Sequence, residues 1–146
     1  MRLVLLGDPV AHSRSPAIQR AALAAAGAEG VYEARRVDEA GLYRACAEIR
    51  SGGLWGANVT MPHKRAAAAA ADRLAPAAER CGAVNTLLRE GDAVAGDNTD
   101  VGGLRLAWER AGIPRGLPVL VLGAGGAAAA ALVALDGADL AVAARR

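Results

Sequence analysis

Short, uninterrupted apolar runs recur along the chain, and each of them predicts a buried β-strand. The first covers residues 3–6 and is followed by Gly7-Asp8-Pro9, a sequence that favours a turn. Runs without polar alternation are typical of parallel sheets, because both faces of such a sheet are covered. Further strands are expected at residues 31–37, 54–59, 117–122 and 138–144.

Amphipathic or alanine-rich segments separate these runs and predict helices. The segment after Asp38, an expected N-cap, places its apolar residues on one face of a helix. Ser15 before Pro16 predicts a second helix start, and Pro62 is expected in the first turn of a third helix. The predicted helices cover residues 16–26, 39–50, 62–71, 76–82, 104–111 and 128–135.

The order of these elements predicts an α/β fold in two parts. The alternation of strands and helices up to residue 71 indicates an open, mostly parallel α/β sheet. Two strand-like runs, 83–88 and 93–96, flank a glycine-bearing turn and predict a β-hairpin. We therefore expect a substrate-binding and catalytic domain at residues 1–100. Residues 101–146 are expected to form the start of a Rossmann-like dinucleotide-binding domain.

Composition and charge argue against several classes of function. The chain has 146 residues, and its formal charge is 17 − 15 = +2, too small to indicate a nucleic-acid or membrane-surface partner. The N-terminal apolar run is too short for a signal peptide or a membrane span. Cys46 and Cys81 fit no metal or redox spacing, so no metal site is expected. We interpret them as buried, reduced thiols of a cytoplasmic protein.

A glycine-rich turn follows the strand expected at residues 117–122. It matches G-x-G-x-x-A at Gly123, Gly125 and Ala128, between a strand and a helix, where such glycines let a pyrophosphate approach the helix N-terminus. The end of the next strand carries Arg145 and Arg146 instead of an acidic residue, which favours the 2′-phosphate of NADP. The alternative is a tight turn followed by two solvent-facing arginines.

Lys64 and Asp100 are the best candidates for an acid/base pair. Lysine can donate or accept a proton at a substrate oxygen, and an aspartate can orient it and hold a substrate hydroxyl. Asp100 ends the polar cluster Asp97-Asn98-Thr99-Asp100, which is larger than the one helix cap, by Thr99 or Asp100, that the position needs. The alternative for Lys64 is a surface lysine on an alanine-rich helix.

Ser13 and Ser15 form a second candidate site. Two hydroxyls over a helix N-terminus can bind an anion, so a carboxylate or phosphate ligand is expected. The alternative is helix capping, for which one serine is sufficient.

Five motifs, in this order along nearly the whole chain, resemble those of the shikimate dehydrogenases. They are His12-Ser13-Arg14-Ser15-Pro16, Asn58-Val59-Thr60-Met61-Pro62-His63-Lys64, Gly82-Ala83-Val84-Asn85-Thr86, Gly96-Asp97-Asn98-Thr99-Asp100 and Gly123-Ala124-Gly125-Gly126-Ala127. The resemblance implies reversible NADPH-dependent reduction of 3-dehydroshikimate to shikimate, in the biosynthesis of aromatic amino acids.

The resemblance also implies roles for individual residues. The serines would hold the substrate carboxylate, the asparagines with Thr60 and Asp100 would bind its hydroxyls, and Lys64 with Asp100 would exchange the proton. The residues assigned to substrate are Ser13, Ser15, Asn58, Thr60, Lys64, Asn85 and Asp100. The residues assigned to NADP are Gly123, Ala124, Gly125, Gly126, Ala127, Arg145 and Arg146.

Two features depart from the family. Its members usually have Asn-Arg-Thr after the second dinucleotide strand, whereas this chain has Ala144-Arg145-Arg146, which leaves the choice of cofactor open. Members are also about twice as long, and a returning helix brings a glutamine to the substrate. We therefore expect this chain to be an N-terminal portion with an incomplete dinucleotide domain.

Three alternatives remain open at this point. The first is a quinate/shikimate dehydrogenase that prefers NAD, and the second is a non-catalytic ligand-binding relative. The third, a relative acting on methylenetetrahydrofolate, also pairs a lysine with a dinucleotide fold, but the serine pair and the Asn-Thr-Asp cluster argue against it. A homodimer is a candidate assembly.

Overall fold

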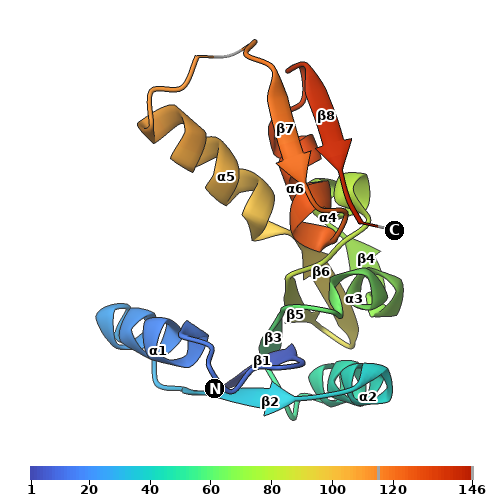
Figure 1. Ribbon diagram of the computed structural model, residues 1–146. Helices are drawn as coiled ribbons and strands as arrows, with labels where there is room; N and C mark the ends of the chain where they lie inside the picture. Colours follow the sequence, from blue (N-terminus) through green and yellow to red (C-terminus); the bar gives the residue numbers. More distant parts are fainter. Residues whose placement is uncertain (115, 146) are drawn as a thin grey trace.

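A computed structural model describes residues 1–114 and 116–145, which form two sheets with six helices around them (Figure 1). The elements are β1 (Arg2–Gly7), α1 (Ser15–Ala25), β2 (Val31–Arg36), α2 (Glu39–Arg50), β3 (Gly56–Val59), α3 (Lys64–Ala70), β4 (Arg73–Leu74), α4 (Pro76–Cys81), β5 (Thr86–Glu90), β6 (Ala93–Asp97), α5 (Thr99–Arg110), β7 (Val119–Leu122), α6 (Gly126–Ala134) and β8 (Leu140–Ala143). The larger sheet has the strand order β2-β1-β3-β5-β6-β4, and the smaller one pairs β7 with β8.

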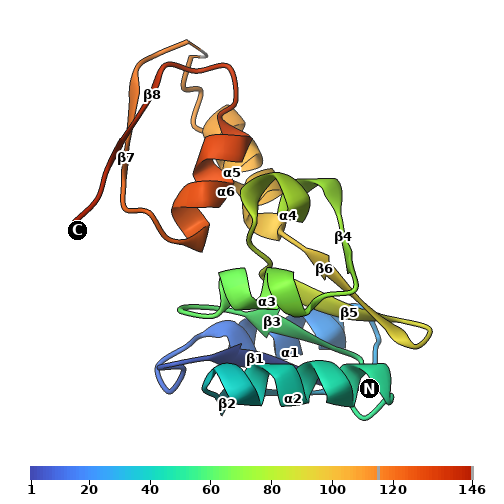
Figure 2. The same ribbon diagram turned by 90° about the vertical axis from the view of Figure 1, so that its right-hand side faces the viewer.

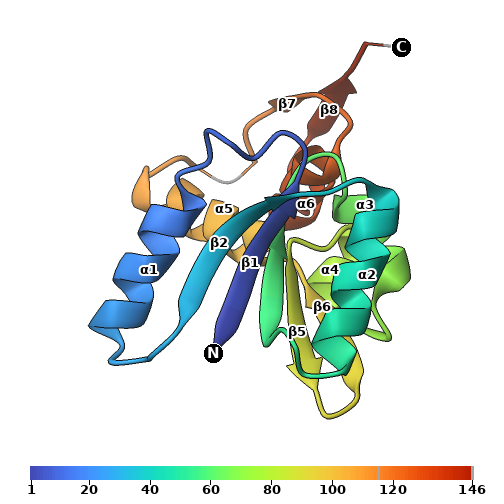
Figure 3. The ribbon, with the colours of Figure 1, turned by 90° about the horizontal axis from the view of Figure 1, so that it is seen from below.

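The larger sheet is mostly parallel, as the order of its elements predicts. Strand β1 pairs in parallel with β2 and β3, and β4 pairs in parallel with β6. Strand β5 runs antiparallel to both β3 and β6, which confirms the expected hairpin. The turn between β5 and β6 contains Gly91 at φ 67°, a left-handed conformation that favours glycine. Figure 3 shows β2, β1, β5 and β6 of this sheet from below.

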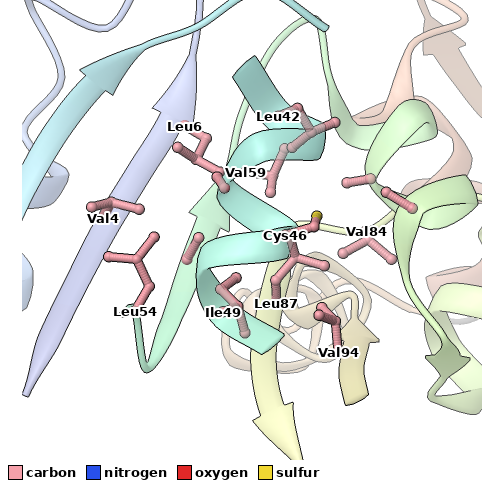
Figure 4. Close-up of a cluster of buried hydrophobic side chains, with 14 of the residues drawn as sticks. Val4, Leu6, Leu42, Cys46, Ile49, Leu54, Val59, Val84, Leu87 and Val94 are labelled. Carbon is pink, nitrogen blue, oxygen red and sulfur yellow. The ribbon is translucent and has the colours of Figure 1, made fainter. Parts of the chain in front are cut away.

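Side-chain alternation along β1 divides the core between the two faces of this sheet. Val4 and Leu6 point to the face covered by α2 and α3, where they join the main hydrophobic cluster (Figure 4). Leu5 points to the other face, where it packs with Tyr32 of β2 and Leu23 of α1. The apolar face expected for α2 is confirmed, because its inward side chains are buried in the main cluster.

The smaller sheet lies above the larger one in Figures 1 and 2 and is sparsely covered. Helix α6 packs on α4 and α5 through a cluster that contains Val101, Ala130 and Ala134. Leu120 of β7 is 60% exposed and Leu122 is 78% exposed. These two side chains therefore leave one side of β7 open to solvent. Within the described residues, no helix is both long enough and apolar enough to cross a bilayer.

Several predicted helix starts are wrong by a few residues. Ser15, the expected N-cap, is already the first residue of α1, and α5 begins at Thr99, before the predicted residue 104. Helix α1 begins at Ser15 after the N-cap Arg14, and α3 begins at Lys64, so Pro62 precedes the helix. A turn closed by the His63 amide on the Thr60 carbonyl (3.0 Å) occupies the expected first turn of α3. The cap of α5 is Asn98, whose side chain accepts from the Asp100 amide.

Two further expectations need correction. The first hairpin strand begins at Thr86 and not at residue 83, because residues 83–85 connect α4 to the sheet. The Val84 amide, for example, donates to the Lys64 carbonyl at 2.8 Å. Both cysteines are free thiols, but only Cys46 is buried; Cys81 is half-buried on α4. Burial is the main cause that raises the pKa of each thiol above its ordinary value.

Asp72 links α2 to the hairpin and gives a testable pH dependence. Its carboxylate accepts hydrogen bonds from the Arg50 guanidinium at 2.9 and 3.0 Å and from the Val94 amide at 2.8 Å. These bonds hold the pKa of Asp72 below its ordinary 3.8, and the bond from Arg50 has the larger effect. A lowered folded-state pKa stabilises the protein above the unfolded pKa, and this contribution is lost as the pH falls through the folded pKa.

We therefore expect Asp72→Asn to lower the melting temperature at pH 7. The difference from wild type should shrink as the pH falls below 3.8. Thermal unfolding followed by circular dichroism between pH 2 and 7 measures this difference in melting temperature. Asp92→Asn, in the exposed hairpin turn, is the control. A difference that stayed constant over this range would mean that the carboxylate charge contributes nothing.

Candidate active site

One edge of the larger sheet collects most of the predicted site residues. Strands β1 and β3 are parallel neighbours, so the segments that follow them leave the sheet at the same edge. The Asp8 amide donates to the Met61 carbonyl at 3.0 Å, which joins these two segments. A Cβ added to Gly7 would lie 2.3 Å from Cγ2 of Thr60, so glycine is required for this close approach. The sheet thereby joins the Thr60–Lys64 turn to the segment after β1, which leads to Ser13 and Ser15.

Lys64 and Asp100 meet at this edge, as predicted. Lys64 is the first residue of α3, and Asp100 lies in the first turn of α5. Lys64 Nζ donates to Asp100 Oδ2 at 2.5 Å. The lysine side chain is 17% exposed and the aspartate side chain 38%, so the pair is open to a ligand mainly from the carboxylate side. The alternative of a surface lysine on an alanine-rich helix is therefore wrong.

Asn85 fixes the second oxygen of the same carboxylate. Its Nδ2 donates to Asp100 Oδ1 at 2.9 Å and to Thr99 Oγ1 at 3.0 Å. Its Oδ1 accepts from the Thr99 amide at 3.0 Å. Asn85 is 8% exposed. The role of Thr99 in holding Asn85 is an addition to the sequence-based site, where Thr99 is only a candidate helix cap.

Asn58 extends the cluster towards β2. Its Oδ1 accepts from the Tyr32 hydroxyl at 2.7 Å, and its Nδ2 donates to Thr86 Oγ1 at 3.3 Å and to the Asn85 carbonyl at 3.4 Å. Tyr32 is 2% exposed, and burial raises its pKa from 10.0 to about 12. Sequence reasoning misses Tyr32; the strand pattern of residues 31–37 could have placed it inside, but nothing local pairs it with Asn58.

Ser13 and Ser15 lie at the start of α1, and both are half-buried. The Ser13 hydroxyl donates to Ser15 Oγ at 3.1 Å and accepts from the Ser15 amide at 3.2 Å. Ser13 therefore satisfies one of the free amides at the helix start, while Ser15 Oγ can still donate to a ligand. This geometry is compatible with both helix capping and anion binding.

His63 holds the turn that precedes Lys64. Its side chain is buried, and Nε2 lies 2.8 Å from the carbonyl of Val37, the residue that follows β2. On the other side, the Lys64 carbonyl accepts from the Val84 amide at 2.8 Å. The backbone that carries the lysine is thus fixed between β2 and the segment before β5. This role of His63 is also absent from the sequence analysis.

The glycine-rich turn approaches the same lysine. A Cβ added to Gly126 would lie 2.9 Å from Lys64 Cβ and 3.0 Å from its Cδ. Gly123 has φ 120°, and the N-cap of α6 is Gly125, so glycines form a tight turn before the helix start. The geometry fits the phosphates of a dinucleotide, since free backbone amides at a helix start bind anions. Across the turn, Arg65 Nη2 donates to the Ala124 carbonyl at 3.0 Å.

Arg145 follows β8 at the same end of the smaller sheet as the glycine turn. The Gly123 amide donates to the Ala143 carbonyl at 2.7 Å, which places the residues after β8 beside the turn. Asp139 lies at the opposite end, where its carbonyl accepts from the Val119 amide. Arg146 lies outside the described residues. Among the described residues, no group of three or more His, Cys, Asp and Glu side chains could hold a metal ion.

Comparison with known proteins agrees with this geometry. The model of the family described as "Shikimate dehydrogenase substrate binding domain" matches residues 5–87. A relative from Symbiobacterium thermophilum named "Shikimate dehydrogenase (NADP(+))" is 47% identical over 140 residues, which cover 95% of this chain and 48% of the relative. The chain spans about half the length of the curated relatives it matches.

Solved structures show the same similarity. Shikimate 5-dehydrogenase from Thermus thermophilus in complex with NADP(H) and shikimate is 44% identical with a TM-score of 0.90, covering 99% of this chain and 56% of that one. The Listeria monocytogenes enzyme in complex with shikimate and NAD is 36% identical with a TM-score of 0.85, covering 99% and 52%. Because the family model covers more than half of the residues, this chain belongs to the shikimate dehydrogenase family through its substrate-binding domain.

Proposed function

We propose that this chain carries the substrate site and the acid/base pair of a shikimate dehydrogenase. The reaction is the reversible NADPH-dependent reduction of 3-dehydroshikimate to shikimate, in the biosynthesis of aromatic amino acids. The observation that carries the proposal is the Lys64–Asp100 pair, held by Asn85 and lying against the glycine turn. A carbonyl reduction needs a proton at the oxygen and a hydride at the carbon. The Lys64–Asp100 pair can provide the proton, and the glycine turn can hold the dinucleotide that would provide the hydride.

Lys64 exchanges the proton. It donates the proton to the substrate oxygen as the carbonyl is reduced and takes it back in the reverse direction. Asp100 orients the ammonium group and accepts a hydrogen bond from a substrate hydroxyl. NADPH bound at the glycine turn would supply the hydride for the carbonyl carbon. A proton transfer of this kind contributes about 10²- to 10⁴-fold to the rate.

The remaining residues bind and orient. Ser13 and Ser15 hold the substrate carboxylate, while Asn58, Thr60 and Asn85 bind hydroxyls together with Asp100. Support comes from the sheet topology, which brings the loops after β1 and β3 to one edge. Residues 1–100 then form the substrate-binding and catalytic domain, and residues 101–146 contribute to the NADP-binding domain.

The cofactor site is proposed at the glycine turn and the end of β8. The close approach of Gly126 to Lys64 would place phosphates beside the acid/base pair. Arg145 would contact the 2′-phosphate of NADP, a charge-assisted bond that NAD lacks. The cofactor-binding residues are Gly123, Ala124, Gly125, Gly126, Ala127, Arg145 and Arg146.

Two experiments test the proposal. Isothermal titration calorimetry of this chain with shikimate tests the substrate site, because the proposed contacts from this chain lie within residues 1–100. Turnover is measured in a fusion of this chain to the C-terminal half of the Symbiobacterium thermophilum relative, called the fusion enzyme below. We expect saturable shikimate binding by the chain and NADP-dependent shikimate oxidation by the fusion enzyme. Absence of both would overturn the proposal.

A quinate/shikimate dehydrogenase that prefers NAD is the second candidate. It is favoured by Ala144, which stands where the family usually has an asparagine before the arginine. The Listeria monocytogenes enzyme, a structural neighbour of this chain, forms a complex with shikimate and NAD. Assays of the fusion enzyme with both substrates and both cofactors separate the two candidates. Faster turnover of quinate with NAD would support the second.

The serine pair gives a prediction about binding. Ser13→Ala combined with Ser15→Ala should weaken shikimate binding by about 10-fold or more, because hydrogen bonds to a charged group are worth about 1.5–3 kcal/mol each. The turnover number should change less, since the carboxylate is shared by reactant and product. Calorimetry measures the affinity, and kinetics of the fusion enzyme measure turnover. An unchanged affinity would leave helix capping as the only role of the serines.

Location and assembly are also proposed here. The free thiols Cys46 and Cys81 support a cytoplasmic location, since reducing compartments keep cysteines unpaired. The homodimer stays a prediction, which size-exclusion chromatography with light scattering can test.

A further inference from the structure

We propose that Tyr32 is a positioning residue of this site, which sets the orientation of the Asn58 amide and, through Thr86, that of Asn85. The inference rests on the proposed function for its consequences on shikimate binding. It starts from one contact, the 2.7 Å hydrogen bond from the Tyr32 hydroxyl to Asn58 Oδ1.

The Asn58 amide has only one orientation that satisfies its neighbours. The Asn85 carbonyl can only accept, so the amide nitrogen of Asn58 and not its oxygen must face it, at 3.4 Å. The oxygen then faces β2, where the Tyr32 hydroxyl donates to it. Without that hydroxyl, the half-buried oxygen would lose the donor that holds it in this position.

Thr86 connects the Asn58 amide to the Asn85 amide through its hydroxyl. It lies directly opposite Asn58 in the antiparallel pairing of β3 with β5. Because Thr86 Oγ1 accepts from Asn58 Nδ2 at 3.3 Å, its hydroxyl proton is free to donate to Asn85 Oδ1 at 2.9 Å. Asn85 Oδ1 is thereby held as an acceptor by two donors, the Thr86 hydroxyl and the Thr99 amide at 3.0 Å, and only the first of them depends on Asn58.

The Asn85 amide is the last member of this series of hydrogen bonds before Asp100. With its oxygen held, its nitrogen is directed at Asp100 Oδ1 at 2.9 Å. Every bond from Tyr32 to Asp100 thus runs in one donor-to-acceptor direction, and hydrogen bonds in such chains polarise and strengthen one another. Removing the first donor should therefore affect groups several bonds away.

The tyrosine ring and its hydroxyl have separable roles. The ring packs with Leu5 and Val10 on the α1 side of the sheet. A phenylalanine would fill the same space, so packing does not require the hydroxyl. Burial raises the pKa of Tyr32 to about 12, so the hydroxyl remains a donor throughout the neutral and moderately alkaline range. The effect of removing it should therefore be constant between pH 6 and 9.

The test compares Tyr32→Phe with Tyr43→Phe in residues 1–146. Tyr43 is the second tyrosine of the chain and lies on α2 with 46% of its surface exposed, so it is a matched control. We expect Tyr32→Phe to weaken shikimate binding by about 10-fold in calorimetry, and Tyr43→Phe to leave it unchanged. In an Asn58→Ala background, Tyr32→Phe should add less than about 2-fold, because its route to the ligand is already removed.

A second measurement keeps the inference independent of the ligand. In nuclear magnetic resonance spectra of the ligand-free chain, Tyr32→Phe should shift the side-chain amide signals of both Asn58 and Asn85, and Tyr43→Phe neither. Unshifted signals would overturn the inference, as would a penalty of equal size in the Asn58→Ala background. If the wild-type chain binds no shikimate, the proposed function of the substrate site fails, and the amide signals still decide whether Tyr32 orients the two asparagines.

Discussion

Lys64→Ala is expected to lower the turnover number of the fusion enzyme by about 10²- to 10⁴-fold while shikimate affinity stays within a few-fold. The proton that Lys64 exchanges is needed mainly in the transition state, and interactions made only there raise turnover without tightening ground-state binding. In this structure, Lys64 Nζ already donates a hydrogen bond to Asp100 Oδ2 at 2.5 Å. Steady-state kinetics and calorimetry measure the two effects separately. Near-normal turnover would remove Lys64 from the mechanism.

Lys64→Arg separates the proton from the charge. A guanidinium group keeps the positive charge beside Asp100 but does not give up its proton in proteins. We therefore expect this variant to lose turnover nearly as completely as Lys64→Ala. Arg73→Ala is the control, since this side chain is 72% exposed and its ion pair with Glu90 lies on the surface. Strong activity of Lys64→Arg would mean that charge alone is sufficient.

The composition of the chain supports the same view of Lys64. It is the only lysine, whereas the other sixteen Lys and Arg positions are arginines. Arginine thus serves wherever this chain needs a cation for surface charge, as at Arg73, or for a bidentate ion pair, as between Arg50 and Asp72. A lysine differs from arginine chiefly in its ability to release a proton. The single lysine lies where the proposed reaction needs that ability.

Local signals were sufficient to predict most of the elements. Asp38 caps α2 as expected, with its Oδ1 accepting from the Gly41 amide at 2.7 Å, and Gly82 ends α4 in a left-handed conformation. Both depend on residues within a few positions of each other. The start of α3 could not be predicted so well, because proline is also compatible with the turn that here precedes the helix.

The site was predictable where chemistry singles out a residue, and not where strand register sets its neighbours. Lys64 and Asp100 were paired from the types of side chain that a proton transfer needs. The contact between Tyr32 and Asn58 depends on the alignment of β2, β1 and β3, and Thr86 faces Asn58 through an antiparallel pairing that the sequence did not specify. A shift of one residue in either register would turn these side chains to the opposite face.

Residues 1–146 alone are expected to oxidise shikimate at least about 100-fold more slowly than the fusion enzyme. Strands β7 and β8 form a two-stranded sheet, and Leu120, Leu122 and Val142 expose 60%, 78% and 49% of their surfaces. Phosphates can still reach the glycine turn, because that contact needs only local backbone amides. A nicotinamide ring, by contrast, would contact few protein groups beyond this open sheet. Hydride transfer needs reacting atoms about 3–3.5 Å apart and aligned, and small misplacements cost about 100-fold.

Residues 1–146 and the fusion enzyme are compared by NADPH formation at equal molar concentrations. Calorimetry with shikimate serves as the control, because both proteins contain residues 1–100 and should bind shikimate with similar affinity. Equal binding with unequal turnover would locate the deficit in the dinucleotide part. Activity of residues 1–146 within about tenfold of the fusion enzyme would contradict the prediction, and it would mean that two strands and the glycine turn suffice to align the cofactor.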